Sequence, residues 1–512
     1  MAFFMSEPYP LPLRPARRRA FSVVLAIELW ERFGYYGMQA VLTIFMVQHL
    51  RMSDTHVNLM QGALGLLMYS LPVLGGVVGD QWLGTRPTLV SGAIGLTLGY
   101  GLLAVSLQHP ALFLPALTLI ALASGLFKPN AGALVKQIYA GDGTALDAAF
   151  TLYYMAVNVG STISMLLVPW LQQFYGSAVA FGLCSLGLLI GLTYYALCSR
   201  WIGRFFTLRK QSLPSLAAEI SRPAPTKRAL VAGALGFLAL WAGSVWLMAS
   251  PSVIRFCVII LSVALILLWG WLYKQVQPHE KAGLFLSYVL SVETMAYLVF
   301  YQQQQSSLTL FALRAVSGTY TLGSWPIFTM SAGQFQALNP LWVMALSPIL
   351  AWLYQRSART GRDVSFPVKI ILGYVCVGIA CCVLWWAAST AQAQVSPWVM
   401  VFAYGAMSLG ELLTMGLGLA IIARYAPARI SALLMGALYL LWGVGMYGGG
   451  LVANIAALPE GAEQHVIRAT FYAPLFAKLS FGAGIMCLVL VGIFPFVKRL
   501  ESYHEKNFKC CK

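Results

Sequence analysis

The stretch Glu28–Gly37 reads ELWERFGYYG and lies inside an apolar segment that covers residues 21–48. Two acids and one base, Glu28, Glu31 and Arg32, therefore fall where a membrane-spanning helix would bury them. A charge at the centre of a bilayer costs on the order of 2.5–3.5 kcal/mol on insertion scales, so charged residues there are candidates for function.

These charges form one stripe with two further polar residues. Glu28, Glu31, Arg32, Tyr35 and Gln39 are spaced at i, i+3, i+4, i+7 and i+11, which is one face of a helix. An acid–acid–base cluster beside a phenol can hold a proton and a carboxylate ligand together. A salt bridge that only packs helices is the alternative, but three charged groups in one span exceed what packing needs.

Composition places the whole chain in a membrane. Hydrophobic residues make up 59% of the 512 positions and charged residues only 10%, and the mean hydropathy is +0.75. Soluble domains carry roughly 25% charged residues, so this chain cannot build an ordinary water-facing surface. Segments of about 20 apolar residues recur about fourteen times. We therefore expect an all-α membrane protein with about 14 transmembrane helices.

The basic residues indicate the orientation of these helices. The net charge is +17, but the Lys and Arg residues gather in short segments between apolar spans, at 14–19, 200–228, 356–362 and 498–512. Cytoplasmic loops of membrane proteins carry such an excess. We expect both termini in the cytoplasm and no nucleic-acid partner. The apolar stretch after the basic N-terminal segment is far longer than that of a signal peptide, so it predicts a first transmembrane helix.

One polar, Pro-containing segment, 199–228, divides the chain. It follows six predicted spans, as a linker between two six-helix halves would, and two-halved bundles are a common transporter plan. The first half is predicted to consist of a cytoplasmic N-terminal segment (1–20) and a first six-helix bundle (21–198). A cytoplasmic linker (199–228) and two inserted lipid-facing helices (229–273) follow. The chain is then predicted to continue with a second six-helix bundle (283–496) and a cytoplasmic tail (497–512).

The sequence offers no pattern for a cofactor, a metal or an enzyme. The nine cysteines are scattered, mostly inside apolar spans, without a CxxC pair or a disulfide framework. The six histidines lie mostly near span ends or in loops, and we find no Ser/His/Asp arrangement. An enzyme would need a nucleophile or a metal cluster, and a channel would lack the two-halved arrangement of charged spans. The sequence therefore predicts a transporter.

Two further charges lie in apolar spans. Lys128 stands in GLFKPN, where Pro129 weakens the helix, and Glu411 stands in SLGELL of the second half. One cation and one anion, one from each half, could hold the two ends of a zwitterion. They could equally form a gate salt bridge, and the sequence does not separate these interpretations.

Several uncharged residues are weaker candidates. Asn158 and Asn339 carry amides that could bind a substrate, although packing between helices explains a lone Asn about as well. Tyr36 and Tyr69 could line a cavity, although a membrane tyrosine is more often an interface anchor.

The segment Gly75–Arg86 (GGVVGDQWLGTR) joins the second and third predicted spans. Asp80 and Arg86 stand at its tight, Gly-rich turn, where a carboxylate can bridge neighbouring helix ends. We expect these two residues to gate conformations rather than bind substrate.

The same motifs resemble the proton-dependent oligopeptide transporter family of the major facilitator superfamily. ELWERFGYYG fits the family's ExxERFxYYG, and GGVVGDQWLGTR is similar to the superfamily's loop motif. GLFKPNAGALVKQIY, FTLYYMAVNVGS, FQALNPLWVMALSPILAWLY and SLGELLTMGLGLAI resemble further family blocks, so the likeness covers nearly the whole chain.

The resemblance implies a fold and a set of roles. The fold would be the major facilitator fold, two six-helix bundles plus two extra helices. Glu28, Glu31 and Arg32 would couple proton and peptide. Arg32 with Lys128 would hold the peptide carboxylate. The amino end of the peptide would be received by Glu411, Asn158 and Asn339. The site would be lined by Tyr35, Tyr36 and Tyr69.

The chain also departs from the family. Many members carry Arg at the position of Gln39 and Glu near Gln302, and both are Gln here, so no orphan charge remains. The family's tryptophans in spans seven and eleven fall on Leu298 and Leu438, which puts the side-chain pockets in doubt. The histidine of animal members falls at about Gly62, so coupling would rest on carboxylates.

The resemblance predicts a proton-coupled symporter that imports di- and tripeptides across the bacterial inner membrane by alternating access. The proton would be the coupling ion, with no cofactor and no metal, and the chain would work as a monomer. The alternative is a related transporter of another small solute, such as nitrate or a carboxylated metabolite. Retention of Glu411 together with Lys128 favours a zwitterion.

Overall fold

The computed structural model describes most of the chain, in four stretches: 13–212, 226–360, 364–458 and 468–510. Four predicted segments lie partly outside the described residues. These are the N-terminal segment at 1–12, the linker at 213–225, the second six-helix bundle at 361–363 and 459–467, and the C-terminal tail at 511–512.

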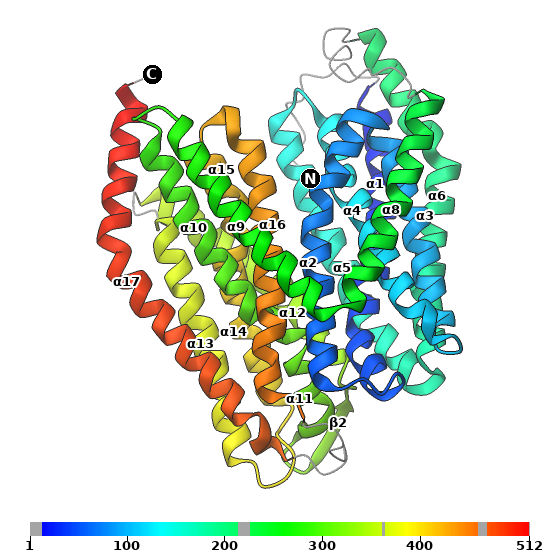
Figure 1. Cartoon of the computed structure of the whole chain (residues 1–512), viewed down its shortest axis with the longest axis vertical. Helices are drawn as coiled ribbons and strands as arrows, with labels where there is room; N and C mark the ends of the chain where they lie inside the picture. The colour runs from blue at the N-terminus through cyan, green and yellow to red at the C-terminus, as the bar shows by residue number, and fades with distance from the viewer. Residues whose placement is uncertain (1–12, 213–225, 361–363, 459–467, 511–512) are drawn as a thin grey trace. The chain divides into compact units, whose positions relative to one another are not determined.

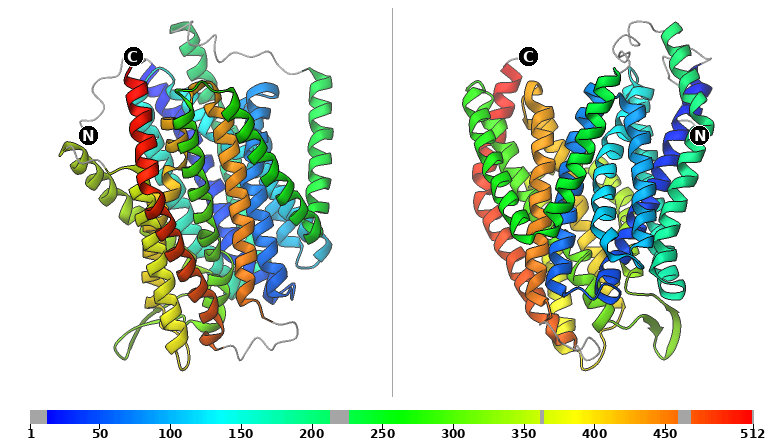
Figure 2. Two further views of the ribbon diagram at one scale, coloured as in Figure 1. Left: turned by 60° about the vertical axis from the view of Figure 1, so that its left-hand side comes forward. Right: turned by 45° about the vertical axis from the view of Figure 1, so that its right-hand side comes forward.

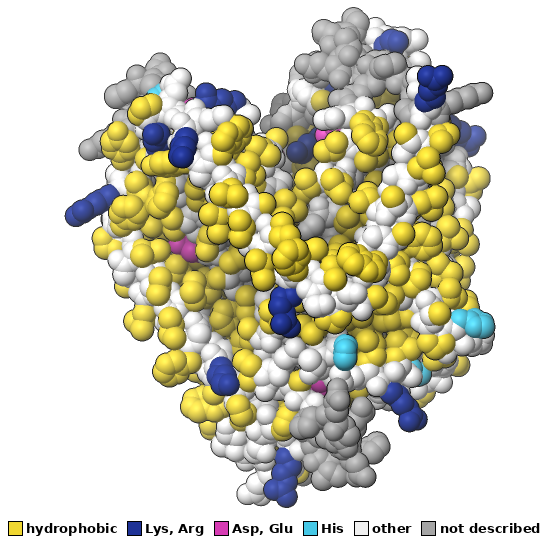
Figure 3. Space-filling model, in the orientation of Figure 1, with side chains coloured by type: hydrophobic (Ala, Val, Ile, Leu, Met, Phe, Trp, Pro, Cys, Tyr) yellow, Lys and Arg dark blue, Asp and Glu magenta, His cyan; other side chains and the backbone are white. Residues whose placement is uncertain are grey.

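The described chain is built almost entirely of long helices (Figure 1). Thirteen of them are long and apolar enough to cross a membrane. The charged helix α1 (Leu13–Gln48) is the fourteenth long helix. The predicted fold class, an all-α membrane protein with about fourteen spans, is confirmed. Figure 3 shows hydrophobic side chains over most of one face, with Lys and Arg mostly toward its ends.

Two compact units divide the chain. Unit 1 consists of Met1–Val41 and Ser70–Ala249, and unit 2 of Leu42–Tyr69 and Ser250–Lys512. Helix α1 and helix α2 (Asp54–Val77) each contribute to both units.

Unit 1 contains a π-helical turn after α2 and five more helices. Their bounds are η1 (Val78–Trp82), α3 (Thr85–Val105), α4 (Phe113–Tyr139), α5 (Gly143–Tyr175), α6 (Ser177–Ser212) and α8 (Lys227–Ala249). Small residues bring α3 and α4 together, since a Cβ at Gly92 would lie 2.8 Å from the Ala123 carbonyl. Such close backbone approach is typical of membrane helix pairs.

Helix α6 extends into the segment that we predicted as linker. Its last turns pack on the C-terminal end of α4. Arg209 is buried and donates hydrogen bonds to the carbonyls of Gln137 and Ala140, at the C-terminal end of α4. Asp142 accepts a hydrogen bond from the backbone N–H of Ala145 and so caps α5. A 3.2 Å ion pair joins Asp142 to Arg17 of α1.

Unit 2 contains the remaining helices and one hairpin. The bounds are α9 (Pro251–Gln275), α10 (Lys281–Tyr301), η3 (Gln302–Gln304), α11 (Ser307–Ala315), α12 (Leu338–Arg359), α13 (Phe366–Thr390), α14 (Trp398–Thr414), α15 (Gly418–Tyr425), α16 (Ala428–Ala453) and α17 (Ala473–Cys510). Helix α17 runs beside α13 (Figures 1 and 2).

A short antiparallel hairpin, β1 (Thr319–Leu322) and β2 (Trp325–Thr329), is the one β element that the described residues form, and we did not predict it (Figure 2). Gly323 occupies the turn with φ of 62°, a conformation that favours glycine and suits a two-residue hairpin. Tyr320 packs inward against Phe335 and Trp398. Trp325 on the other strand is 81% exposed.

The early part of α2 packs within unit 2, although we assigned it to the first predicted bundle. Two glycines allow this, because a Cβ at Gly62 would lie 3.2 Å from the Cα of Tyr447, and one at Gly65 only 2.8 Å from Met446. There is also no room at Gly62 for the histidine of animal relatives. The two inserted helices, α8 and α9, are mostly exposed. Only 6% and 11% of their apolar 18-residue stretches are buried within the protein.

Candidate functional site

The charged stripe of α1 forms a compact cluster in unit 1. The Nε atom of Arg32 lies 2.7 Å from Glu28 Oε1 and 3.1 Å from Glu31 Oε2, and both glutamates are fully buried. Glu28 Oε2 and both oxygens of Glu31 have no hydrogen-bond partner among the described residues. One arginine thus faces two acids whose bonding capacity is mostly unused.

Lys128 of α4 joins this cluster from a neighbouring helix. Its Nζ lies 4.1 Å from the centroid of the Tyr35 ring, and it forms no ion pair within the described part of the chain. The Tyr35 hydroxyl accepts a 3.3 Å hydrogen bond from Gln39 Nε2, and the Tyr36 ring packs edge-on against Tyr35. Unit 1 therefore places a second cation near the two acids.

The structure adds one residue that we did not select from the sequence. Tyr153 of α5 lies close enough to Glu28 for the two side chains to interact. It belongs to the FTLYYMAVNVGS block, in which only Asn158 was chosen. Asn158 itself donates to the carbonyl of Tyr154 one turn earlier, so one of its two amide N–H groups is used within its own helix.

Unit 2 brings Glu411 and Asn339 together. Asn339 Nδ2 donates to Glu411 Oε2 at 2.8 Å and to the Ser408 hydroxyl at 3.0 Å. Ser408 lies one turn before Glu411 on α14, a spacing that the sequence shows but that we did not use. The amide is held toward the carboxylate, which leaves the other carboxylate oxygen for a ligand cation.

The remaining aromatic candidate, Tyr69, lies in an aromatic cluster of unit 2. Its ring centroid is 6.0 Å from Trp442 and 6.5 Å from Tyr439. Leu298 and Leu438, which replace family tryptophans, are buried in the same cluster. Tyr69, Tyr439 and Trp442 thus form an aromatic group within unit 2.

The two predicted gating residues do not contact each other. Asp80 lies in the π-helical turn, is exposed and makes no ion pair with a described residue. Arg86 packs its guanidinium on Phe206, 5.0 Å from the ring centroid. Their gating role stays a prediction.

The glutamine that replaces the usual acid, Gln302, is fully buried, and neither of its amide atoms has a partner among the described residues. It opens a run of four buried glutamines, where α10 passes through a 3-10 turn. Gln303 donates to the carbonyls of Val299 and Gly449, and so ties this turn to α16.

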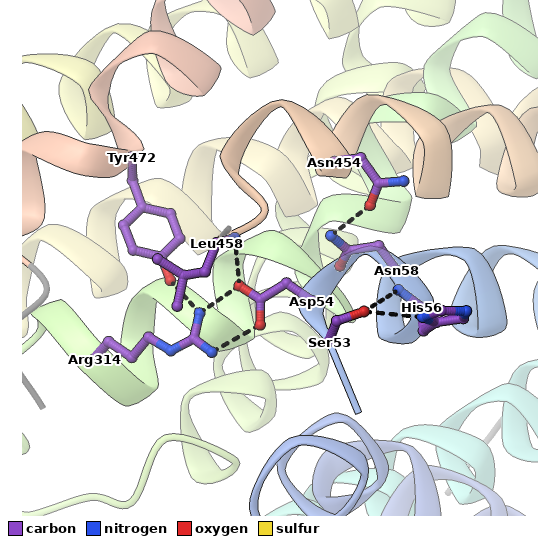
Figure 4. A network of polar contacts seen from close by, with 8 residues as sticks. All are labelled: Ser53, Asp54, His56, Asn58, Arg314, Asn454, Leu458 and Tyr472. Atoms are coloured by element: carbon purple, nitrogen blue, oxygen red, sulfur yellow. Dashed lines mark hydrogen bonds and ion pairs between the residues drawn. The ribbon is translucent and has the colours of Figure 1, made fainter. Parts of the chain in front are cut away.

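A second buried acid–base group escaped the sequence analysis. Asp54 and Arg314 of unit 2 form a bidentate pair at 2.6 and 2.8 Å, and both side chains are almost fully buried (Figure 4). Asp54 also accepts from the backbone N–H of Leu458, and Arg314 donates to the Tyr472 hydroxyl. Neither residue was selected from the sequence, and 260 residues separate the two partners.

Beside this pair, Asn58 of α2 donates to Asn454 at 3.0 Å (Figure 4). The network joins α2, α11 and the segment after α16. Within the described residues, no group of His, Cys, Asp and Glu could hold a metal ion.

Comparison with known proteins gives consistent matches over the chain. The model of the POT family matches residues 86–467. Dipeptide and tripeptide permease B of Edwardsiella piscicida is 35% identical over 494 residues, which cover 94% of this chain and 96% of the relative. Dipeptide and tripeptide permease A of Pectobacterium carotovorum is also 35% identical, over 94% of this chain and 92% of the relative.

Solved structures agree. A bacterial homologue of the human drug peptide transporters PepT1 and PepT2 superimposes with a TM-score of 0.80 at 38% identity, over 94% of this chain and 99% of that chain. Tetrameric PepTSo2 gives a TM-score of 0.82 at 36% identity over the same shares. Together with the α1 motif and the helical architecture, these matches show that the chain is a multi-pass membrane protein that belongs to the POT family, the proton-dependent oligopeptide transporters.

Proposed function

We propose that this protein is a proton-coupled symporter that imports di- and tripeptides by alternating access. Like other members of the POT family, it is a secondary transporter and not an enzyme. The observation that carries the proposal is the α1 cluster, in which Glu31 is fully buried beside Arg32 and neither of its oxygens has a hydrogen bond from a described residue.

The proton half of the mechanism follows from this burial. A carboxylate without hydrogen bonds in an apolar span is costly, and binding a proton removes the charge. Once Glu31 is neutral, Glu28 alone faces the two cations Arg32 and Lys128, so the cluster can attract another anion. A peptide carboxylate has the charge and geometry to take that place, since guanidinium groups bind carboxylates well. Proton binding and carboxylate binding then support each other.

The other end of a peptide needs an acceptor for its ammonium group. In unit 2, Glu411 offers a carboxylate oriented by Asn339 and Ser408. A simple anion such as nitrate, or a carboxylated metabolite, would have no use for this acid. The retained Glu411 therefore favours a zwitterionic peptide over these solutes. Tyr35, Tyr36, Tyr69 and Asn158 are proposed to line the substrate path.

Orientation, assembly and coupling ion complete the proposal. The protein resides in the bacterial inner membrane with both termini cytoplasmic, because the basic clusters would then obey the positive-inside rule. A single chain is the functional unit, although the related PepTSo2 is tetrameric. The proton is the coupling ion, without cofactor or metal.

Uptake of a labelled dipeptide into proteoliposomes tests the function. Uptake should require an inward proton gradient, should persist without sodium, and should fall when unlabelled tripeptide competes. Uptake that a protonophore leaves unchanged would refute coupling. Competition by nitrate but not by peptides would favour the alternative solute class. A thermal-shift screen of the same solutes reports binding separately, since a ligand stabilises the state that binds it.

A further inference from the structure

One buried tyrosine takes no part in the cluster as described so far. Tyr100 of α3 is fully buried, and its hydroxyl has no hydrogen-bond partner among the described residues. Its ring lies against α1, because a Cβ added at Gly34 would be 2.8 Å from the ring carbon Cε2. Gly34 follows Glu31 by three residues, so Glu31 and the Tyr100 contact share one face of α1.

Glu31 is the natural partner for this hydroxyl. Both of its oxygens are buried and accept no hydrogen bond from a described residue, although Oε2 lies 3.1 Å from Arg32 Nε. The Glu31 carboxylate is one of the charged groups close enough to Tyr100 to act on it. A phenol donor and a carboxylate acceptor therefore lie unsatisfied on the same side of α1.

Other titratable groups surround this pair and define its setting. Those that act on Tyr100 or Glu31 come from α1, α4, α5 and α6, and they are Glu28, Arg32, Tyr35, Lys128, Tyr153 and Cys184. Both cations of this set, Arg32 and Lys128, act on Glu31. Near Tyr100, Glu31 is the group able to accept a strong, charge-assisted bond from the hydroxyl.

We propose that Tyr100 is a positioning residue for proton coupling, whose hydroxyl donates a hydrogen bond to the Glu31 carboxylate after the proton has left. A hydrogen bond to an ionised carboxylate is roughly twice as strong as one to the neutral acid. The bond therefore forms when Glu31 releases its proton and loosens when the proton returns. The inference rests on the proposed role of Glu31 as the proton carrier.

The substitution Tyr100→Phe removes only the hydroxyl and keeps the ring against Gly34. Losing the donor makes the ionised carboxylate less stable, so Glu31 should release its proton only at higher pH. The pH profile of dipeptide uptake should move by about half a unit to one unit toward alkaline pH. Counterflow exchange at saturating peptide should stay within about twofold of the wild type, because the binding cations are unchanged.

Tyr195→Phe is the matched control, since Tyr195 is also buried in unit 1 but lies beside Arg86. It should leave the profile in place. A Tyr100→Phe profile that superimposes on a proton-coupled wild type overturns the inference, whereas a wild type without proton dependence overturns the proposed function itself.

Infrared difference spectra provide a test that does not depend on a Tyr100 variant. In the native protein, a tyrosine band should change together with the carboxyl band as pH is raised. Both changes should be absent in Glu31→Gln. A carboxyl change without a tyrosine change would overturn the proposed hydrogen bond.

Discussion

Two buried acid–base groups of this molecule differ in how completely their atoms are bonded. In unit 2, both Asp54 oxygens bind Arg314, and Leu458 and Tyr472 take up further capacity (Figure 4). In unit 1, Arg32 is shared between two acids, and three carboxylate oxygens of Glu28 and Glu31 accept no hydrogen bond from any residue that the structure describes.

The contrast separates structure from transport chemistry. Both carboxylate oxygens of Asp54 are bonded, and among the atoms of this pair only Arg314 Nε lacks a partner within the described residues. The pair holds α2 against α11 for as long as both charges remain. An under-bonded cluster gains when a proton or a ligand arrives, because unsatisfied buried groups are costly. We therefore infer that the pair of unit 2 stabilises one state, whereas the cluster of unit 1 changes its state during each cycle.

Breaking the bidentate pair should have the largest effect on stability. Asp54→Asn leaves Arg314 as a buried cation without its counter-ion, which typically destabilises by about 3–5 kcal/mol. The apparent melting temperature in detergent should fall clearly. Glu280→Gln is the control, because its ion pair with Arg429 is partly exposed and such pairs contribute about 0–1 kcal/mol. Equal melting temperatures for the two variants would contradict the contrast.

The substitution Glu31→Gln removes the site that we assign to the proton but keeps its size. Gradient-driven uptake should be lost, because no proton accompanies the peptide. Counterflow exchange should remain measurable, and thermal stability should change little. Loss of both transport modes together would show that Glu31 has only a structural role.

The substitution Glu411→Ala should affect one end of the substrate. Losing a hydrogen bond to a charged group removes about 1.5–3 kcal/mol, or roughly 10- to 150-fold in affinity for a dipeptide with a free amine. The N-acetylated dipeptide should bind almost as it does to the wild type. Competition assays with the two ligands measure the difference. An equal loss for both would place Glu411 away from the amino end.

The smallest change in stability is expected at Gln302, a neutral side chain that has no hydrogen-bond partner among the described residues. Gln302 has no hydrogen bond to lose, so Gln302→Met should change stability by less than about 1 kcal/mol. Gln303→Met is the contrasting variant, because Gln303 bonds two carbonyls, and it should be the less stable of the two. A large loss for Gln302→Met alone would reveal a partner that this state does not show.

Much of the architecture could be predicted because the bilayer imposes strong rules. Apolar length predicted fourteen spans, and the stripe spacing predicted that Glu28, Glu31 and Arg32 lie together on α1. The early part of α2 was harder, because its assignment to unit 2 depends on how closely Gly62 approaches Tyr447. The hairpin at 319–329 was missed for a similar reason, since Tyr320 is held by Phe335 and Trp398 rather than by a strong local pattern.

By itself, the sequence determined the class of protein, the family and the face of α1 that carries the charges, because composition and helical periodicity are local properties. Only the tertiary structure decided which charges are bonded. The pairing of Asp54 with Arg314 joins residues 260 positions apart, and Tyr100 lies against Gly34 across two helices. Hydrogen-bond saturation depends on such distant contacts, and it is what distinguishes the ELWERFGYYG cluster from an ordinary buried salt bridge.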